Sequence, residues 1–218
     1  MKSKPIELVI FDCDGVLVDS EMISSRVLSD IFEEIGITLS PAAVYEKFRG
    51  GSMNNTIQYV EDQLKTPIPI DLENEYRKRS FIAYRNEMKA VDGIENILSS
   101  LKVKKCVGSN GPQSKIKINL EVTGLSQYFH NDHIHSAYDI QKWKPLPDLY
   151  LYAAELHHVS PARCLVVEDS IHGAQAAQAA GMRCLGYAAD TAPADFHAVK
   201  AIAIDHMSDI DTHFPELF

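Results

Sequence analysis

Two aspartates, separated by one residue, follow a short apolar run near the amino terminus. Asp12 and Asp14 come directly after residues 8–11, and Gly15 follows them. Because residues i and i+2 of an extended chain face the same way, this spacing predicts two carboxylates in one site. Two anions held so close together need a cation, a proton or both. Such a site can bind Mg²⁺ and leave one carboxylate as a nucleophile toward phosphorus, with the other as a general acid.

A hydroxyl and an amide follow a second apolar run, residues 105–108. Ser109 and Asn110, together with the backbone amides of a turn, could hold the oxygens of a phosphoryl group. In isolation such a pair is more often a turn or a helix cap, because these side chains bond to nearby backbone. Its place at the end of an apolar run is what favours a phosphate-binding role.

A lysine and a second acidic pair come later in the chain. Lys144 stands directly before Pro145, where its charge could offset that of a phosphoryl group and a nucleophile. Lys142 would share its face in an extended segment and is the alternative cation. Glu168 and Asp169 follow a further apolar run and could complete a metal site. Alone, the lysine would be a solvated surface residue and the acidic pair a helix N-terminus. The order of carboxylates, hydroxyl, lysine and carboxylates is hard to explain by chance.

The composition is that of an ordinary globular protein. The 218 residues are 45% hydrophobic, which suits one large domain or a domain with an insert, and the formal net charge is −9. Basic residues are scattered apart from residues 77–79, which argues against nucleic acid as a partner. The amino terminus has no apolar segment long enough for a signal peptide or a membrane span, so we expect a cytoplasmic protein without membrane contact. We expect a monomer. Four cysteines, each in a different apolar run, are expected to be reduced core thiols: Cys13, Cys106, Cys164 and Cys184.

Short apolar runs alternate with helical patterns along most of the chain. Strands are expected at residues 8–11, 105–108, 133–136, 164–167, 184–187 and 201–204. Helices are expected at residues 94–101, 115–122, 149–157 and 172–180. This alternation predicts an α/β fold with a doubly wound (Rossmann-like) parallel sheet, and an active site at the carboxyl ends of its strands.

The segment between the first two expected strands is far longer than a crossover needs. Apolar spacing and capping residues predict helices over residues 23–35, 55–65 and 71–88, and one that begins at Ser40-Pro41. The expected domains are a sheet core of residues 1–18 and 93–218 and an inserted all-helical cap of residues 19–92.

Three stretches resemble one enzyme superfamily. They are FDCDG (residues 11–15), CVGSNGP (residues 106–112) and YDIQKWKP (residues 138–145). Together with the acidic pair at residues 168–169, these motifs occur in order over essentially the whole chain. The chain is identified as a member of the haloacid dehalogenase superfamily, in the subgroup that resembles β-phosphoglucomutase. The resemblance implies a Rossmann-like core with a helical cap, and phosphoryl-transfer chemistry.

By this resemblance, Asp12 is the nucleophile that becomes an aspartyl phosphate, and Asp14 is the general acid and then the general base. Mg²⁺ would be bound by Asp12, the backbone carbonyl of Asp14 and Asp169, assisted by Glu168. The implied reaction is Mg²⁺-dependent hydrolysis of a small phosphate ester, either a sugar phosphate or a sugar-acid phosphate. Phosphoryl transfer needs mainly positioning and charge stabilisation, which a metal, a lysine and backbone amides supply.

The resemblance also assigns the remaining binding roles. Ser109 with Asn110 would hold the phosphoryl oxygens, and Lys144 would neutralise charge. Residues 47–55 resemble the specificity loop of similar caps, in which case Arg49 and Asn54 would contact the far end of the substrate. As a purely structural feature, the same segment is a loop followed by a helix N-cap.

Three other functions are alternatives. A phosphosugar mutase of the β-phosphoglucomutase type needs a cap arginine and histidine that are replaced here by Met53 and Ser24, so hydrolysis is favoured. A 2-haloacid dehalogenase dispenses with an acid at the position of Asp14. A non-catalytic phospho-acceptor, like a response-regulator receiver, lacks a helical insert after its first strand.

Two further groups of residues do not predict a site. His130, His133 and His135 lack acidic or thiol companions at regular spacing, so no dedicated metal site is predicted there. Tyr150 and Tyr152 are predicted to be packing residues rather than ligands.

Overall fold

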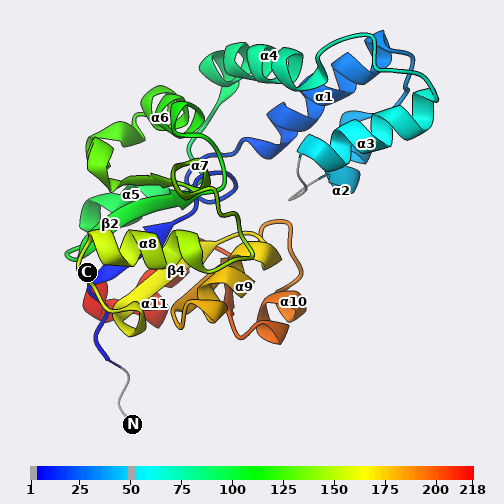
Figure 1. Ribbon diagram of the computed structural model, residues 1–218. Coiled ribbons are helices and arrows are strands. Elements are labelled where there is room, and N and C mark those ends of the chain that lie inside the picture. Colours follow the sequence, from blue (N-terminus) through cyan, green and yellow to red (C-terminus); the bar gives the residue numbers. More distant parts are fainter. Residues whose placement is uncertain (1–3, 49–52) are drawn as a thin grey trace. The chain divides into compact units, whose positions relative to one another are not determined.

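The computed structural model describes residues 4–48 and 53–218 (Figure 1). A six-stranded sheet forms its centre, with the strand order β3-β2-β1-β4-β5-β6 and every neighbouring pair parallel. The strands are β1 (Leu8–Phe11), β2 (Lys104–Ser109), β3 (Ile134–Ser136), β4 (Cys164–Glu168), β5 (Arg183–Tyr187) and β6 (Ile202–Ile204). The predicted doubly wound parallel sheet is confirmed.

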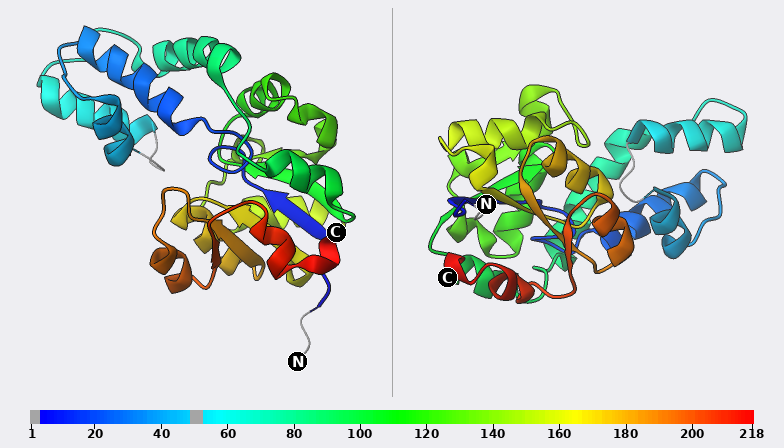
Figure 2. Two further views of the ribbon diagram at one scale, coloured as in Figure 1. Left: turned by 180° about the vertical axis from the view of Figure 1, so that it is seen from behind. Right: turned by 90° about the horizontal axis from the view of Figure 1, so that it is seen from below.

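Helices cover both faces of this sheet (Figure 2). They are α5 (Ile94–Ser100), α6 (Gln113–Val122), α7 (Ala137–Ile140), α8 (Asp148–Leu156), α9 (Ile171–Ala179), α10 (Pro193–Ala198) and α11 (Asp209–His213). Helices α5 and α6 lie on the opposite side of β2 from α8 (Figure 1). All residues of β1 and β4 are buried, as expected for central parallel strands covered on both faces.

Small side chains bring α8 and α9 close to the sheet. Ala153 of α8 and Ala174 and Ala177 of α9 are fully buried in one core with Ile10 of β1 and Val166 of β4. The core therefore fixes the strand ends, from which the candidate site residues extend, against two closely packed helices.

The segment between β1 and β2 forms a second compact unit, Asp19–Lys89. Its helices are α1 (Glu21–Glu34), α2 (Pro41–Phe48), α3 (Met53–Leu64) and α4 (Leu72–Glu87). They bury their own core, which includes Val27, Ile31, Phe32 and Val60. The hydroxyl of Ser40 accepts a hydrogen bond from the Ala43 N–H at 3.2 Å, so it caps α2.

The helical unit leaves and rejoins the sheet unit at adjacent points. Val18 and Ala90 form an antiparallel bridge, and the Val91 N–H donates to the Leu17 carbonyl at 3.1 Å. The sheet unit consequently comprises Met1–Val18 and Ala90–Phe218, so the second junction follows Lys89 rather than Asp92. The difference arises because this short ladder ties Ala90 and Val91 to the segment after β1.

Within the described part of the chain, no helix combines the length and the apolar character that crossing a bilayer requires.

Candidate active site

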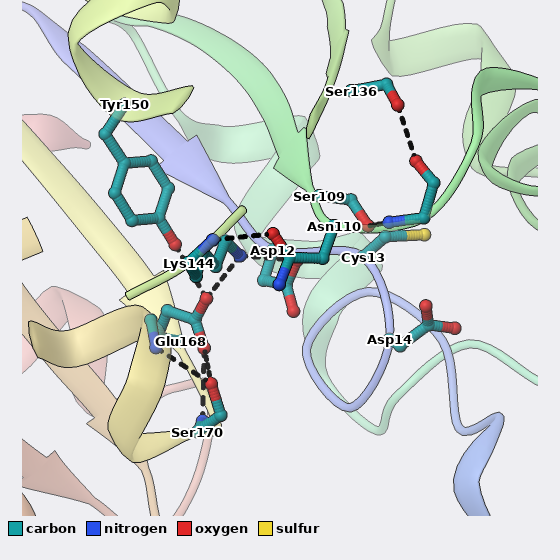
Figure 3. A network of polar contacts seen from close by, with 12 residues as sticks. Asp12, Cys13, Asp14, Ser109, Asn110, Ser136, Lys144, Tyr150, Glu168 and Ser170 are labelled. Carbon is teal, nitrogen blue, oxygen red and sulfur yellow. Dashed lines mark hydrogen bonds and ion pairs between the residues drawn. The ribbon is translucent and has the colours of Figure 1, made fainter. Parts of the chain in front are cut away.

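The ends of β1 and β4 bring two acidic residues together. Phe11 of β1 pairs in register with Val167 of β4, and the Asp12 N–H donates to the Val167 carbonyl at 3.0 Å. Asp12 and Glu168, each the next residue, therefore lie beside one another (Figure 3). This register is what brings the two acids at the strand ends together.

Lys144 bridges the two carboxylates. Its Nζ lies 2.9 Å from Asp12 Oδ1 and also donates a hydrogen bond to Glu168 Oε1 (Figure 3). Lys144 is only 8% exposed, whereas Lys142 is exposed, so Lys144 is the lysine of this site. Burial alone would lower the pKa of Lys144, but the charges of Asp12 and Glu168 raise it well above its ordinary value. The ammonium group is thus a permanent charge between two acids.

Glu168 is completely buried and has four hydrogen-bond donors around it. Oε1 accepts from Lys144 and from the Tyr150 hydroxyl at 2.6 Å, and Oε2 accepts from the backbone N–H of Ser170 at 3.1 Å and its hydroxyl at 2.8 Å. Burial acts to raise the pKa of Glu168, but Lys144 and these hydrogen bonds lower it overall. The group is an ionised carboxylate whose two oxygens are occupied by four donors, and Lys144 is one of them.

Tyr150 is a site residue, although the sequence predicted only a packing role for it. Its ring is fully buried among core residues and lies 5.0 Å from Lys144 Nζ, while its hydroxyl donates to Glu168. The signal that could have identified it is the spacing to Lys144: six residues along, Tyr150 lies in the helix that begins just after the lysine.

Gly173 makes room for the Glu168 carboxylate. A Cβ atom at Gly173 would lie 1.8 Å from Glu168 Oε1, which is far inside van der Waals contact. The Ser170 hydroxyl also accepts from the Gly173 N–H at 3.0 Å, so the first turn of α9 encloses the buried acid.

The acids at the ends of β1 and β4 fit a divalent cation. Oxygen atoms of Asp12, Glu168 and Asp169 lie within 4.8 Å of one another. Burial raises the pKa of Asp12 to about 7 despite the nearby charge of Lys144. Asp12 Oδ1 is buried and forms an ion pair with Lys144, but it accepts no well-aligned hydrogen bond from the described residues. Asp169 Oδ2 lies directly over Gly15, 2.3 Å from where a Cβ would stand, and Gly15 has a φ of 78° that favours glycine. A hard cation would suit this oxygen-rich, under-satisfied place.

The last residue of β2, Ser109, and the residues after it form a compact turn. Ser109 is buried, and its hydroxyl accepts from the Gly111 N–H at 3.0 Å. Asn110 Oδ1 accepts from the backbone N–H of Lys144 at 3.0 Å, so this amide oxygen holds the lysine segment. The sequence predicted only a phosphoryl contact for Asn110 and not this hydrogen bond to the lysine segment.

Asp14 points elsewhere than predicted. Its carboxylate pairs with Lys115, with 2.7 Å between Nζ and Oδ2, and turns away from the Asp12 carboxylate (Figure 3). The expectation of a shared direction was wrong because β1 ends at Phe11, so the alternation of an extended strand no longer applies at Asp14. The segment instead coils back, with the Leu17 and Val18 amides both donating to the Cys13 carbonyl.

The predicted cap contacts belong to the helical unit. Asn54 is an exposed residue in the first turn of α3. Arg49 lies outside the described residues. Their contact with a substrate stays a prediction.

The histidine-rich segment gathers around a buried pair. His135 and His157 approach within 3.2 Å through their Nε2 atoms, and burial lowers the pKa of both, that of His135 to about 4. The thiol of Cys106 lies nearby, with the three ligand atoms within 4.8 Å of one another. A hydrogen bond between two neutral rings accounts for the pair, and the nearby thiol could not be inferred from sequence spacing.

Comparisons with known proteins agree with these features. Residues 9–187 match the family model described as haloacid dehalogenase-like hydrolase. The 6-phosphogluconate phosphatase of Escherichia coli K12 is 36% identical over 98% of this chain and 95% of its own length. A haloacid dehalogenase-like protein of unknown function from Agrobacterium tumefaciens superposes with a TM-score of 0.85 at 34% identity, covering 97% of this chain and 98% of that one. A family hydrolase from Deinococcus radiodurans, solved with bound phosphate and sodium, has a TM-score of 0.82 at 28% identity, covering 98% and 96%. The chain therefore belongs to the haloacid dehalogenase-like hydrolase family.

Proposed function

We propose that this protein is a Mg²⁺-dependent phosphatase that hydrolyses a small phosphate ester through an aspartyl phosphate on Asp12. One observation carries the proposal: the buried Asp12 carboxylate is paired with Lys144, whose ammonium group also donates a hydrogen bond to Glu168. This arrangement fixes a nucleophilic oxygen and a charge-stabilising cation in one place, as phosphoryl transfer requires.

In the proposed reaction, Asp12 attacks phosphorus, the bond to the ester oxygen breaks, and Asp14 gives its proton to that oxygen. Water then attacks the phosphorus of the aspartyl phosphate while Asp14 takes the proton, which releases phosphate and restores Asp12. Lys144 offsets negative charge in both steps. The Ser109 hydroxyl and the amides of its turn bind the phosphoryl oxygens.

Asp12, Asp169 and the backbone carbonyl of Asp14 would hold Mg²⁺, which when bound supplies Lewis-acid stabilisation of the phosphoryl charge. Glu168 contributes indirectly, because four donors already occupy its oxygens. Its task is to hold Lys144 against Asp12.

The proposed substrate class is a sugar phosphate or sugar-acid phosphate. The E. coli relative is named for 6-phosphogluconate, so this ester is the first to test. Arg49 and Asn54 are proposed to contact the part of the substrate away from the phosphoryl group.

We expect the protein to release inorganic phosphate from small esters with Mg²⁺, and to stop when the metal is chelated. Asp12→Asn removes the nucleophile and should lower turnover by more than about 1,000-fold, while Asp14→Asn removes the proton donor and should cost about 100-fold. The measurement is phosphate release across a panel of sugar phosphates, sugar-acid phosphates and nucleotides. Asp132→Asn changes an exposed aspartate and serves as the control. Wild-type activity in Asp12→Asn would refute the mechanism.

The same assay separates hydrolysis from mutase chemistry. A phosphosugar mutase would interconvert sugar phosphates with a bisphosphate activator and would release little phosphate. Ser24, where a mutase needs histidine, is hydrogen bonded to the Tyr84 hydroxyl at 2.6 Å within the helical unit, which favours hydrolysis.

A further inference from the structure

A second lysine contacts the other catalytic acid of the proposed mechanism. Lys115, in the first turn of α6, places its Nζ 2.7 Å from Asp14 Oδ2, and the two side chains are only 23% and 19% exposed. Asn119, one helical turn further on, is fully buried and points its Nδ2 toward Asp14 Oδ1 at 3.4 Å. Residues i and i+4 share a helix face, so α6 presents one donor to each oxygen of the carboxylate.

This pair lies beside the proposed phosphate-binding turn. A Cβ atom at Gly111 would lie 3.5 Å from Ser109 Oγ, 3.6 Å from Lys115 Cδ and 3.9 Å from Asp14 Oδ2. The hydroxyl, the lysine stem and the carboxylate therefore surround one point. Lys115 holds Asp14 next to the turn, on the side of the site opposite Lys144 (Figure 3 shows Lys144 and Asp14 on the two sides of Asp12).

An ordinary surface ion pair would not explain this arrangement. Exposed pairs contribute little because water competes for both charges. Here the lysine is mostly buried and is combined with Asn119, whose Oδ1 is buried without a hydrogen-bond partner among the described residues. A buried unsatisfied oxygen is a cost to the fold, which is tolerated where the amide serves another purpose.

We propose that Lys115 is a positioning residue that, with Asn119, aims the Asp14 carboxyl group at the ester oxygen of the substrate. The inference rests on the proposed function, in which Asp14 gives its proton to that oxygen as the phosphorus–oxygen bond breaks and remains as a carboxylate beside the Lys115 ammonium. Lys115 is needed most for esters of sugars and other alcohols, because a poor leaving group requires the proton. A nitrophenyl ester leaves without one, so it needs Asp14 and Lys115 far less in this step.

The test compares kcat/KM for a sugar phosphate and for p-nitrophenyl phosphate in Lys115→Met. Both substrates form the same aspartyl phosphate, so kcat/KM isolates the step in which the ester oxygen leaves. We expect a loss of about 10- to 100-fold for the sugar phosphate and less than about 3-fold for the nitrophenyl ester. Lys115→Arg should recover most of the lost activity, and Lys117→Met, which removes an exposed lysine of the same helix, should match the wild type.

A double-mutant cycle with Asp14→Asn tests whether Lys115 acts through Asp14. In the Asp14→Asn background, Lys115→Met should cause no further loss on the sugar phosphate. Equal losses on the two esters, a full additional loss in the Asp14→Asn background, or unchanged activity on the sugar phosphate would each overturn the inference. Failure of the proposed function looks different, because the wild-type protein would then hydrolyse neither ester.

Discussion

Single residues show how the site holds two acids and a lysine out of water. An isolated buried carboxylate is very costly, and Glu168 is tolerated because each of its oxygens receives two donors. Among the described residues, only Lys144 forms an ion pair with Asp12, and burial, together with the nearby charges of Glu168 and Asp14, raises the pKa of Asp12 to about 7. The sequence predicted Asp12, Lys144 and Glu168 as one site from their order. It did not predict Tyr150, because a tyrosine in an apolar helix pattern looks like core, and its hydroxyl partner comes from a distant strand.

Replacing Tyr150 by phenylalanine tests the buried hydrogen bonds. Tyr150→Phe keeps the ring and removes one donor from Glu168, which should lower the free energy of unfolding by about 1–2 kcal/mol. Denaturant unfolding with and without the change measures this. Tyr152→Phe, on a half-buried neighbour, is the matched control and should cost less. Equal effects of the two substitutions would show that the hydrogen bond from the Tyr150 hydroxyl to Glu168 does not stabilise the fold.

At the scale of elements, the site depends on where strands end and helices begin. The parallel register of β1 and β4 was implied by the alternation of apolar runs and helical patterns, and it places Asp12 beside Glu168. The direction of Asp14 was not predictable in the same way. Strand alternation gives a side-chain direction only while the backbone stays extended, and the point at which β1 stops depends on hydrogen bonds within the following coil. Its partner Lys115 could be found only by folding α6 against that coil.

In the first turn of α9, a glycine-to-alanine substitution is expected to lower the stability of the fold, although such a change in a helix usually raises it. Changing a helical glycine to alanine normally stabilises a helix by about 0.5–1 kcal/mol. In Gly173→Ala the new methyl group would overlap Glu168, so we expect a loss of about 2 kcal/mol or more in the free energy of unfolding, together with lower phosphatase activity. Denaturant unfolding and phosphate release measure the two effects. A gain in stability would mean that Glu168 can move away without cost.

On the scale of the whole molecule, the prediction of a parallel sheet interrupted by a helical segment rested on two strong signals. Six short apolar runs matched six strands to within about one residue at most ends, and the long gap after the first run matched the helical unit. The short helices α7, α10 and α11 were not predicted, because four to six residues are too few to show a periodic pattern. Neither could the sequence show that His157, at the end of α8, meets His135 of β3.

That histidine pair should make the stability of the fold depend on pH. The pKa of His135 is about 4 in the folded protein, below the ordinary value of 6.5, and that of His157 is lowered too, so the unfolded chain binds more protons between these values. The free energy of unfolding is therefore highest above about pH 6.5 and declines as the pH falls toward 4. The contribution of His135 to this decline is about 2–3 kcal/mol. The measurement is the free energy of unfolding at several pH values. His135→Gln should flatten the dependence in this window, whereas His172→Gln, on an exposed histidine, should leave it as in the wild type.

The two ends of the helical insert are neighbours: the Asp19 amide donates to the Lys89 carbonyl at 3.0 Å, and Val18 bridges to Ala90. This excursion, a segment of some seventy residues, thus begins and ends at two neighbouring residue pairs of the backbone. Any other segment whose two ends lie equally close together could be joined to the sheet at the same place. A change in the length of this segment would therefore not require any strand of the sheet to move. If selectivity belongs to the excursion and bond-breaking to the sheet, each can evolve at its own pace.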